Sequence, residues 1–110
     1  MNIEKINDEI KKFVNERDWE QFHSPKNLSM ALSVEASELV EIFQWLKENE
    51  IDENKEKIFS AVKDEVADIF YYTVRMCQKM NINLEEAFFD KMEKNRLKHP
   101  VERVKGKSSV

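Results

Sequence analysis

The sequence contains very little of what turns, strands and disulfides are made from. Among 110 residues there are one glycine, two prolines, one cysteine and two histidines. Hairpins and glycine-rich phosphate loops are therefore not expected, and a lone cysteine excludes an intramolecular disulfide. No window approaches the roughly 18 apolar residues of a membrane span, and the first residues lack the apolar run of a signal peptide. We expect an all-α cytoplasmic protein that does not contact membranes.

The composition that remains is that of one small globular domain. Hydrophobic residues make up 41% and charged residues 36%, and the formal net charge is −4. An acidic balance argues against a nucleic-acid partner, for which a basic footprint is expected. Lysines and arginines nevertheless crowd the last fifth of the chain, where a local basic patch could meet an anionic ligand. We expect a single domain over residues 1–100 and a mobile tail over 101–110.

Hydrophobic periodicity predicts four main helices connected by short joints. The joint before the second helix (17–23) is unusually aromatic, and Ser24 followed by Pro25 reads as a helix start. A charged stretch over 47–57 reads as a loop and the entry to the third helix. The expected helices cover residues 2–16, 25–47, 53–80 and 84–98.

Two of these helices place acidic residues inside their apolar stripes. On an ideal helix, Glu35 lies at the centre of the stripe of the second helix, and Glu38 lies about 60° away on the same face. Glu65 and Asp68 repeat this arrangement on the third helix. An ionised carboxylate that leaves water without a partner costs several kcal/mol, so some compensation is needed.

Four inward carboxylates predict a cation site if the two helices pack face to face. Residues three apart are neighbours on a helix, so each pair can present two carboxylates to one point. Hard divalent cations prefer such oxygen ligands, and Mg²⁺ fits best because it commonly shares its shell with substrate phosphates. The alternative to a metal site is that each acid is simply salt-bridged or partly exposed. A di-iron bundle is disfavoured because Glu20-Gln-Phe-His23, its one Glu-x-x-His match, lies in the joint.

If the cation site serves a phosphate-bearing substrate, aromatic residues near these helices are candidates for binding a base, and lysine or asparagine residues for binding the phosphates. Aromatic faces stack on bases at about 1–3 kcal/mol each, although for any one aromatic residue taken alone a core position is the better explanation. His23 could donate a hydrogen bond to a base or sugar. The aromatic candidates are Trp19, Phe22, Trp45 and Tyr72, and the candidate phosphate contacts are Lys79, Lys91 and Asn95.

Three segments together carry a family resemblance. RDWEQFHSPKNLSMALSVEASELVEIFQW, DEVADIFYY and KMEKNRLKHP follow one another in the chain. In this order they closely resemble the MazG-like nucleotide pyrophosphohydrolases, most of all the dCTP pyrophosphatase branch. The likeness extends over roughly residues 10–100.

The resemblance implies a MazG-like helical bundle assembled as a homotetramer, or a dimer, with active sites between subunits. It implies Mg²⁺-dependent hydrolysis of a (deoxy)nucleoside triphosphate to monophosphate and pyrophosphate, with Glu35, Glu38, Glu65 and Asp68 as metal ligands. Trp19, His23, Trp45 and Tyr72 would line the base and sugar pocket. For the reaction we expect Glu38 to assist deprotonation of the attacking water, with dCTP or a modified dCTP as substrate.

Two further hypotheses remain open. The chain could be a non-catalytic oligomerisation or regulatory module whose metal site is structural. It could also be a dUTP-directed or phosphoribosyl-ATP-directed enzyme of the same superfamily.

Overall fold

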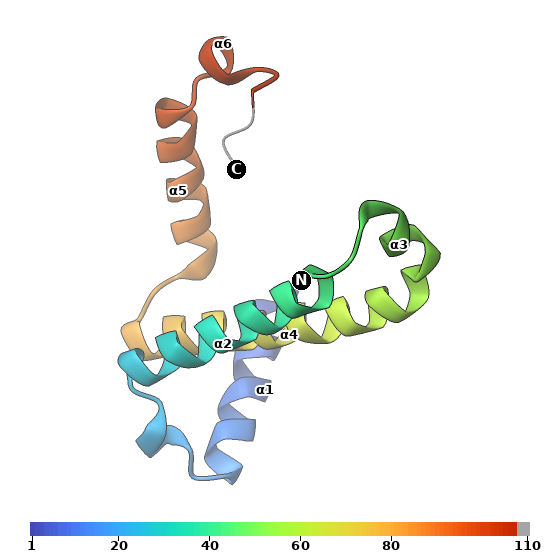
Figure 1. Cartoon of the computed structure of the whole chain (residues 1–110). Helices are drawn as coiled ribbons and strands as arrows, with labels where there is room; N and C mark the ends of the chain where they lie inside the picture. The colour runs from blue at the N-terminus through green and yellow to red at the C-terminus, as the bar shows by residue number, and fades with distance from the viewer. Residues whose placement is uncertain (108–110) are drawn as a thin grey trace.

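The computed structural model describes residues 1–107, and within that range the chain forms helices and no strand. Two long helices, α2 and α4, run antiparallel side by side and are joined through the short α3 (Figure 1). α1 crosses behind them, and α5 extends away from this body toward α6 (Figure 1). The elements are α1 (Ile3–Glu16), the 3₁₀ turn η1 (Glu20–Phe22), α2 (Pro25–Phe43), α3 (Glu48–Glu53), α4 (Lys55–Met80), α5 (Leu84–Lys98) and α6 (Val101–Val104).

Polar side-chain caps mark the starts of three main helices, α1, α2 and α5. The side chains of Asn2, Ser24 and Asn83 each accept a backbone N–H bond from the first turn of α1, α2 and α5, at 3.0–3.1 Å. Such caps satisfy amide donors that have no partner within the helix. α4 ends at Met80 and is followed by Asn81, whose left-handed backbone (φ 54°) asparagine tolerates better than most residues do. The bounds expected for the first, second and fourth helices at these ends are confirmed to within a residue.

The buried core is small and lies where α1 crosses α4. Ile10 and Val14 of α1 pack with Val74 of α4, and each is at most 7% exposed. Leu28, on the first turns of α2, is also buried. This packing holds α1 against α4, and it therefore places side chains of α1 near the acidic residues of the α2 and α4 stripes.

Two expectations about the joints were wrong. The second helix ends at Phe43 rather than near residue 47, and the supposed loop contains α3. Glu50 stabilises the start of α3 by accepting the backbone N–H of Lys47 at 3.3 Å, a local contact that apolar periodicity does not report. The third helix accordingly begins at Lys55.

Part of the expected tail is helical in the described residues. Residues 101–104 form α6, which follows Pro100, because proline suits a helix start as well as a stop. Residues 108–110 lie outside the described residues. The mobility expected for the tail therefore stays a prediction.

The chain is extended for its length. Its radius of gyration is 17.4 Å, whereas a compact chain of this size is expected near 13 Å. Large apolar side chains are exposed, including Phe88, Phe89 and Leu97 on α5 and Val34, Val40 and Phe59 on α2 and α4. The helices of one chain thus leave apolar faces uncovered. Over the described residues, no helix has the length and apolar character needed to cross a membrane.

Candidate functional site

The packing of α2 against α4 brings three of the four predicted acids together. Glu35 and Glu38 lie one turn apart on α2, and Glu65 faces them from α4. One carboxylate oxygen from each residue lies within 4.8 Å of those from the other two. We call these three residues the acid cluster. All three side chains are half-buried, and the acids predicted within the apolar stripes of the two helices do face one another.

Among residues 1–107, no lysine or arginine forms an ion pair with the acid cluster. Within the described residues, the Oε2 atoms of Glu35 and Glu65 are buried and have no hydrogen-bond partner. Burial, together with the carboxylates of Glu38 and Glu65, raises the pKa of Glu35 to about 7. Burial also raises the pKa of Glu65. Partnerless buried oxygens in a set of oxygen donors are what a hard divalent cation binds, so these residues fit such a metal.

Asp68, the fourth predicted acid, lies beside the acid cluster rather than in it. Its side chain is exposed, and it lines a cavity of about 360 Å³ together with Glu35. Its charge nevertheless contributes to raising the pKa of Glu35. The cavity has the size of a small-molecule site. We call it the aromatic cavity; its lining residues are Glu9, Ile10, Phe13, Trp19, Glu35, Asp68, Tyr71 and Tyr72.

A chain of edge-to-face aromatic contacts forms one side of this cavity. Trp19 and Phe13 have ring centroids 5.6 Å apart, Phe13 and Tyr71 are 5.9 Å apart, and Tyr71 and Tyr72 are 4.8 Å apart. Trp19 and Tyr72 were predicted from the sequence, and both lie at the cavity beside Glu35. Phe13 and Tyr71 were missed. The signals were present, because Phe13 lies on the apolar stripe of the first helix and Tyr71 adjoins Tyr72.

Three predicted residues of the aromatic joint and the α2 end lie away from the cavity lining. Phe22 is 59% exposed and Trp45, just beyond α2, is 85% exposed. His23 is half-buried and points its Nδ1 atom at Arg75 rather than at the acid cluster. In a single chain, therefore, only Trp19 of the aromatic joint lines the aromatic cavity.

The predicted phosphate contacts are also outside the cavity of their own chain. Lys91 and Asn95 lie on α5, which projects from the body (Figure 1). Lys79 forms an ion pair with Glu20. None of the three lines the aromatic cavity over the described residues.

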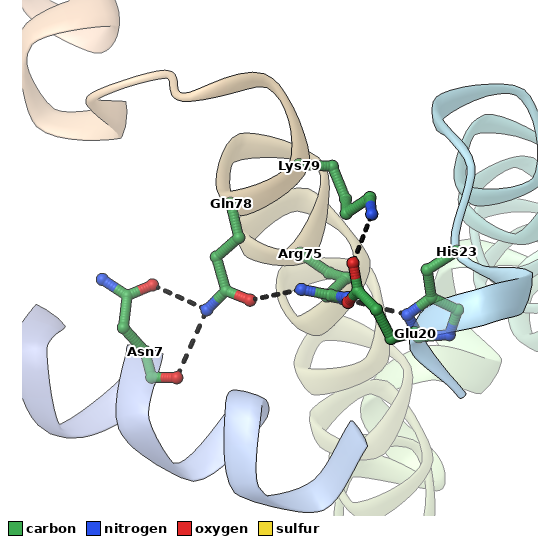
Figure 2. A network of polar contacts seen from close by, with 6 residues as sticks. All are labelled: Asn7, Glu20, His23, Arg75, Gln78 and Lys79. Carbon is green, nitrogen blue, oxygen red and sulfur yellow. Dashed lines mark hydrogen bonds and ion pairs between the residues drawn. The ribbon is translucent and has the colours of Figure 1, made fainter. Parts of the chain in front are cut away.

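A polar network that sequence reasoning missed surrounds Arg75 (Figure 2). Arg75 forms an ion pair with Glu20, and its Nε–H donates to His23 Nδ1 at 2.9 Å. Since Nδ1 accepts, the neutral His23 ring carries its proton on Nε2. Burial and the adjacent guanidinium lower the pKa of His23, whereas Lys79 and Arg75 lower that of Glu20. We use the name Arg75 network for these six residues: Asn7, Glu20, His23, Arg75, Gln78 and Lys79.

A sequence signal for Arg75 existed. It lies seven residues, two helical turns, after Asp68, at about −80° from Glu65 on an ideal helix. That position places a guanidinium at the edge of an apolar stripe, where a buried charge requires partners.

Comparisons with known proteins identify a family and several relatives of this chain. A MazG-like family model matches residues 30–109. Mouse dCTP pyrophosphatase 1 is 39% identical over 98 residues, which are 86% of this chain and 56% of that protein. The human protein of that name is 36% identical over 98 residues, 87% of this chain and 58% of its own length. The chain thus spans little more than half the length of these relatives.

One solved structure aligns with this chain over nearly the full length of both proteins. A pyrophosphatase from Archaeoglobus fulgidus DSM 4304 superposes with a TM-score of 0.83 at 39% identity, covering 89% of this chain and 92% of that one. The family model alone matches well over half of the chain. With its antiparallel α2 and α4 and the acids between them, this chain belongs to the MazG-like family.

Proposed function

We propose that the protein is a Mg²⁺-dependent nucleoside triphosphate pyrophosphohydrolase, which converts a (d)NTP to the monophosphate and pyrophosphate. The observation that carries this proposal is the pair of buried, partnerless oxygens of Glu35 and Glu65 beside an aromatic cavity of nucleoside size. The names of the relatives and of the structural neighbour support the same chemistry. We expect the reaction to clear or balance nucleotides in the cytoplasmic pool.

The metal would be held by Glu35, Glu38 and Glu65, with Asp68 completing the set from the cavity side. Bound there, Mg²⁺ supplies charge neutralisation of the polyphosphate and lowers the pKa of a water. Glu38 accepts the proton of the attacking water. The water oxygen adds to the α-phosphorus, the bond from that phosphorus to the oxygen bridging to the β-phosphorus breaks, and pyrophosphate leaves.

The base is assigned to the aromatic cavity. Trp19 and Tyr72 line the cavity together with Glu35 and offer ring surfaces for stacking on a base. Phe22, His23 and Trp45 lie away from this cavity in the single chain, and we assign them to the base and sugar pocket on the family resemblance. We favour dCTP or a modified dCTP, consistent with the dCTP pyrophosphatase relatives.

The phosphate contacts are assigned to a neighbouring subunit of a homotetramer or dimer. Lys91 and Asn95 lie on α5, away from the cavity of their own chain. The exposed apolar side chains of α5 and the extended shape of the single chain support assembly with further copies. Lys79 already pairs with Glu20, so we assign most of the leaving-charge neutralisation to Lys91 and Asn95.

The test is hydrolysis of each common NTP and dNTP with Mg²⁺, following monophosphate and pyrophosphate separately. Glu65→Gln removes a carboxylate of the acid cluster, and Glu41→Gln on the exposed side of α2 is the matched control. We expect Glu65→Gln to abolish product formation and Glu41→Gln to retain it.

The ranking of bases then separates a dCTP enzyme from a dUTP-directed or phosphoribosyl-ATP-directed one, provided the last substrate is included in the panel. Absence of turnover by folded protein whose melting temperature rises with Mg²⁺ would instead indicate a structural metal site in a regulatory module.

A further inference from the structure

Arg75 is the one charged residue buried among the described residues, with 4% of its surface exposed. Three of its nitrogen atoms have partners. Nε donates to His23 Nδ1 at 2.9 Å, Nη1 donates to Gln78 Oε1 at 3.0 Å, and Nη2 pairs with Glu20. A buried guanidinium is costly unless its donors are satisfied, and breaking such a set leaves an uncompensated charge. A buried arginine at this position is therefore stable only while these three partners are present.

Two of the three partners of Arg75 flank one short turn. Glu20 begins η1 and His23 follows it, more than 50 residues before Arg75 in the chain. Lys79, one turn further along α4, forms an ion pair with the other carboxylate oxygen of Glu20. Figure 2 shows both cations reaching Glu20 from α4.

The network continues from α4 to α1. The Nε2 atom of Gln78 donates to Asn7, at 2.9 Å from Oδ1 and 3.3 Å from the carbonyl oxygen. Over residues 1–107, every side-chain hydrogen bond between residues more than five apart belongs to the Arg75 network. The polar attachment of the aromatic joint to α4 therefore depends on this set alone.

The segment held in this way carries Trp19. Trp19 immediately precedes Glu20 and lines the aromatic cavity. On its other side the turn is tied to α1, because the Trp19 N–H donates to the Val14 carbonyl at 3.1 Å and Asp18 adopts a left-handed backbone (φ 53°). With 40% of its surface exposed, Trp19 is not fixed by burial. Its ring also contacts Phe13 edge to face at a centroid distance of 5.6 Å, so its position depends on that contact and on the two attachments of the turn.

We propose that Arg75 is a positioning residue for nucleotide binding: by clamping Glu20 and His23 to α4, it holds the Trp19 ring at the aromatic cavity. This inference rests on the proposed function. Arg75 does not reach the acid cluster, since its partners are Glu20, His23 and Gln78. Its loss should therefore weaken nucleotide binding and leave the metal site and the chemical step in place.

The test is a double-mutant cycle between Arg75→Met and Trp19→Ala, measured as KM and kcat for the best nucleotide. Methionine fills similar space without leaving a buried charge, and Glu20 stays solvated because half of its side chain is exposed. We expect each single variant to raise KM about ten-fold, as for loss of one base-stacking contact. The double variant should be no worse than the poorer single variant, because both changes remove the same contact.

The controls separate positioning from stability and from the proposed function. Lys12→Met breaks an exposed pair with Glu16 on α1 and should leave KM unchanged. Arg75→Lys keeps the charge but cannot bridge His23 and Glu20 together, so KM should stay raised. If Arg75→Met does not fold, Glu20→Gln replaces it in the cycle, with a smaller rise in KM.

An unchanged KM in a folded Arg75→Met variant, or KM effects that multiply with those of Trp19→Ala, would overturn the positioning role while the wild type remains active. A fall in kcat equal to the rise in KM would overturn it too. A wild type that turns over no nucleotide while still binding it overturns the proposed function instead. In that case the same cycle is measured as nucleotide affinity.

Discussion

Replacing Glu35 with glutamine should stabilise the metal-free protein at alkaline pH and change little at acidic pH. In the folded protein the pKa of Glu35 is about 7, raised first by burial and then by Glu38 and Glu65, against 4.5 for an exposed glutamate. The folded state therefore binds the proton more tightly than the unfolded state does. The resulting stability is complete below pH 4.5 and is lost as the pH rises through about 7.

The size of this effect follows from the two pKa values. The difference corresponds to a ceiling of about 3 kcal/mol in the free energy of unfolding. Because the Glu35 side chain is only half-buried, solvent screening reduces this to about 1–2 kcal/mol. The transition belongs to the acid cluster as a whole, since Glu65 titrates with Glu35.

The assay is urea unfolding in EDTA at several pH values between 5 and 8, with protein concentration held constant because assembly contributes to stability. Glu35→Gln should equal the wild type near pH 5 and exceed it by about 1–2 kcal/mol at pH 8. Glu41→Gln, on the same helix, is the control and should follow the wild type throughout. A difference between Glu35→Gln and wild type that does not vary with pH would refute the reasoning.

Three further outcomes are expected. Mg²⁺ should raise the melting temperature more at pH 8 than at pH 6, and much less in Glu35→Gln, as thermal scans at matched ionic strength will show. Leu28→Ala should cost about 3 kcal/mol in urea unfolding, because Leu28 is 1% exposed; a loss below about 1 kcal/mol would contradict its core assignment. Leu97→Asp on α5 should lower the particle mass in sedimentation, since Leu97 is 82% exposed and we assign its face to another copy; an unchanged mass would count against that.

Most of what the sequence predicted correctly is local. The starts of α2 and α5 were predictable because the side chains of Ser24 and Asn83 cap amides only three residues away. The meeting of Glu35 and Glu65 was also predictable, because two apolar stripes with matching acids have one sensible way to pack.

What could not be predicted depends on tertiary contacts without a short-range signature. The partners of Arg75 lie more than 50 residues away in the chain, in a turn whose periodicity is uninformative. Phe13 reaches Tyr71 only because α1 crosses α4. The distance of Lys91 from the aromatic cavity follows from the direction that α5 takes after Asn81, which no periodicity encodes.

The order of the elements divides the site into two parts of different origin. The acid cluster lies on α2 and α4, consecutive long helices that form one antiparallel hairpin through α3 (Figure 1). Much of the aromatic cavity is instead contributed by residues before α2, from Glu9 to Trp19. Under the proposed function, sequence change in that leading segment would alter which base is accepted while the acid cluster on the hairpin stays intact. In evolutionary terms, that proposal places the metal site and part of the base pocket on separate stretches of the gene, joined through Glu35, which belongs to both the acid cluster and the cavity lining.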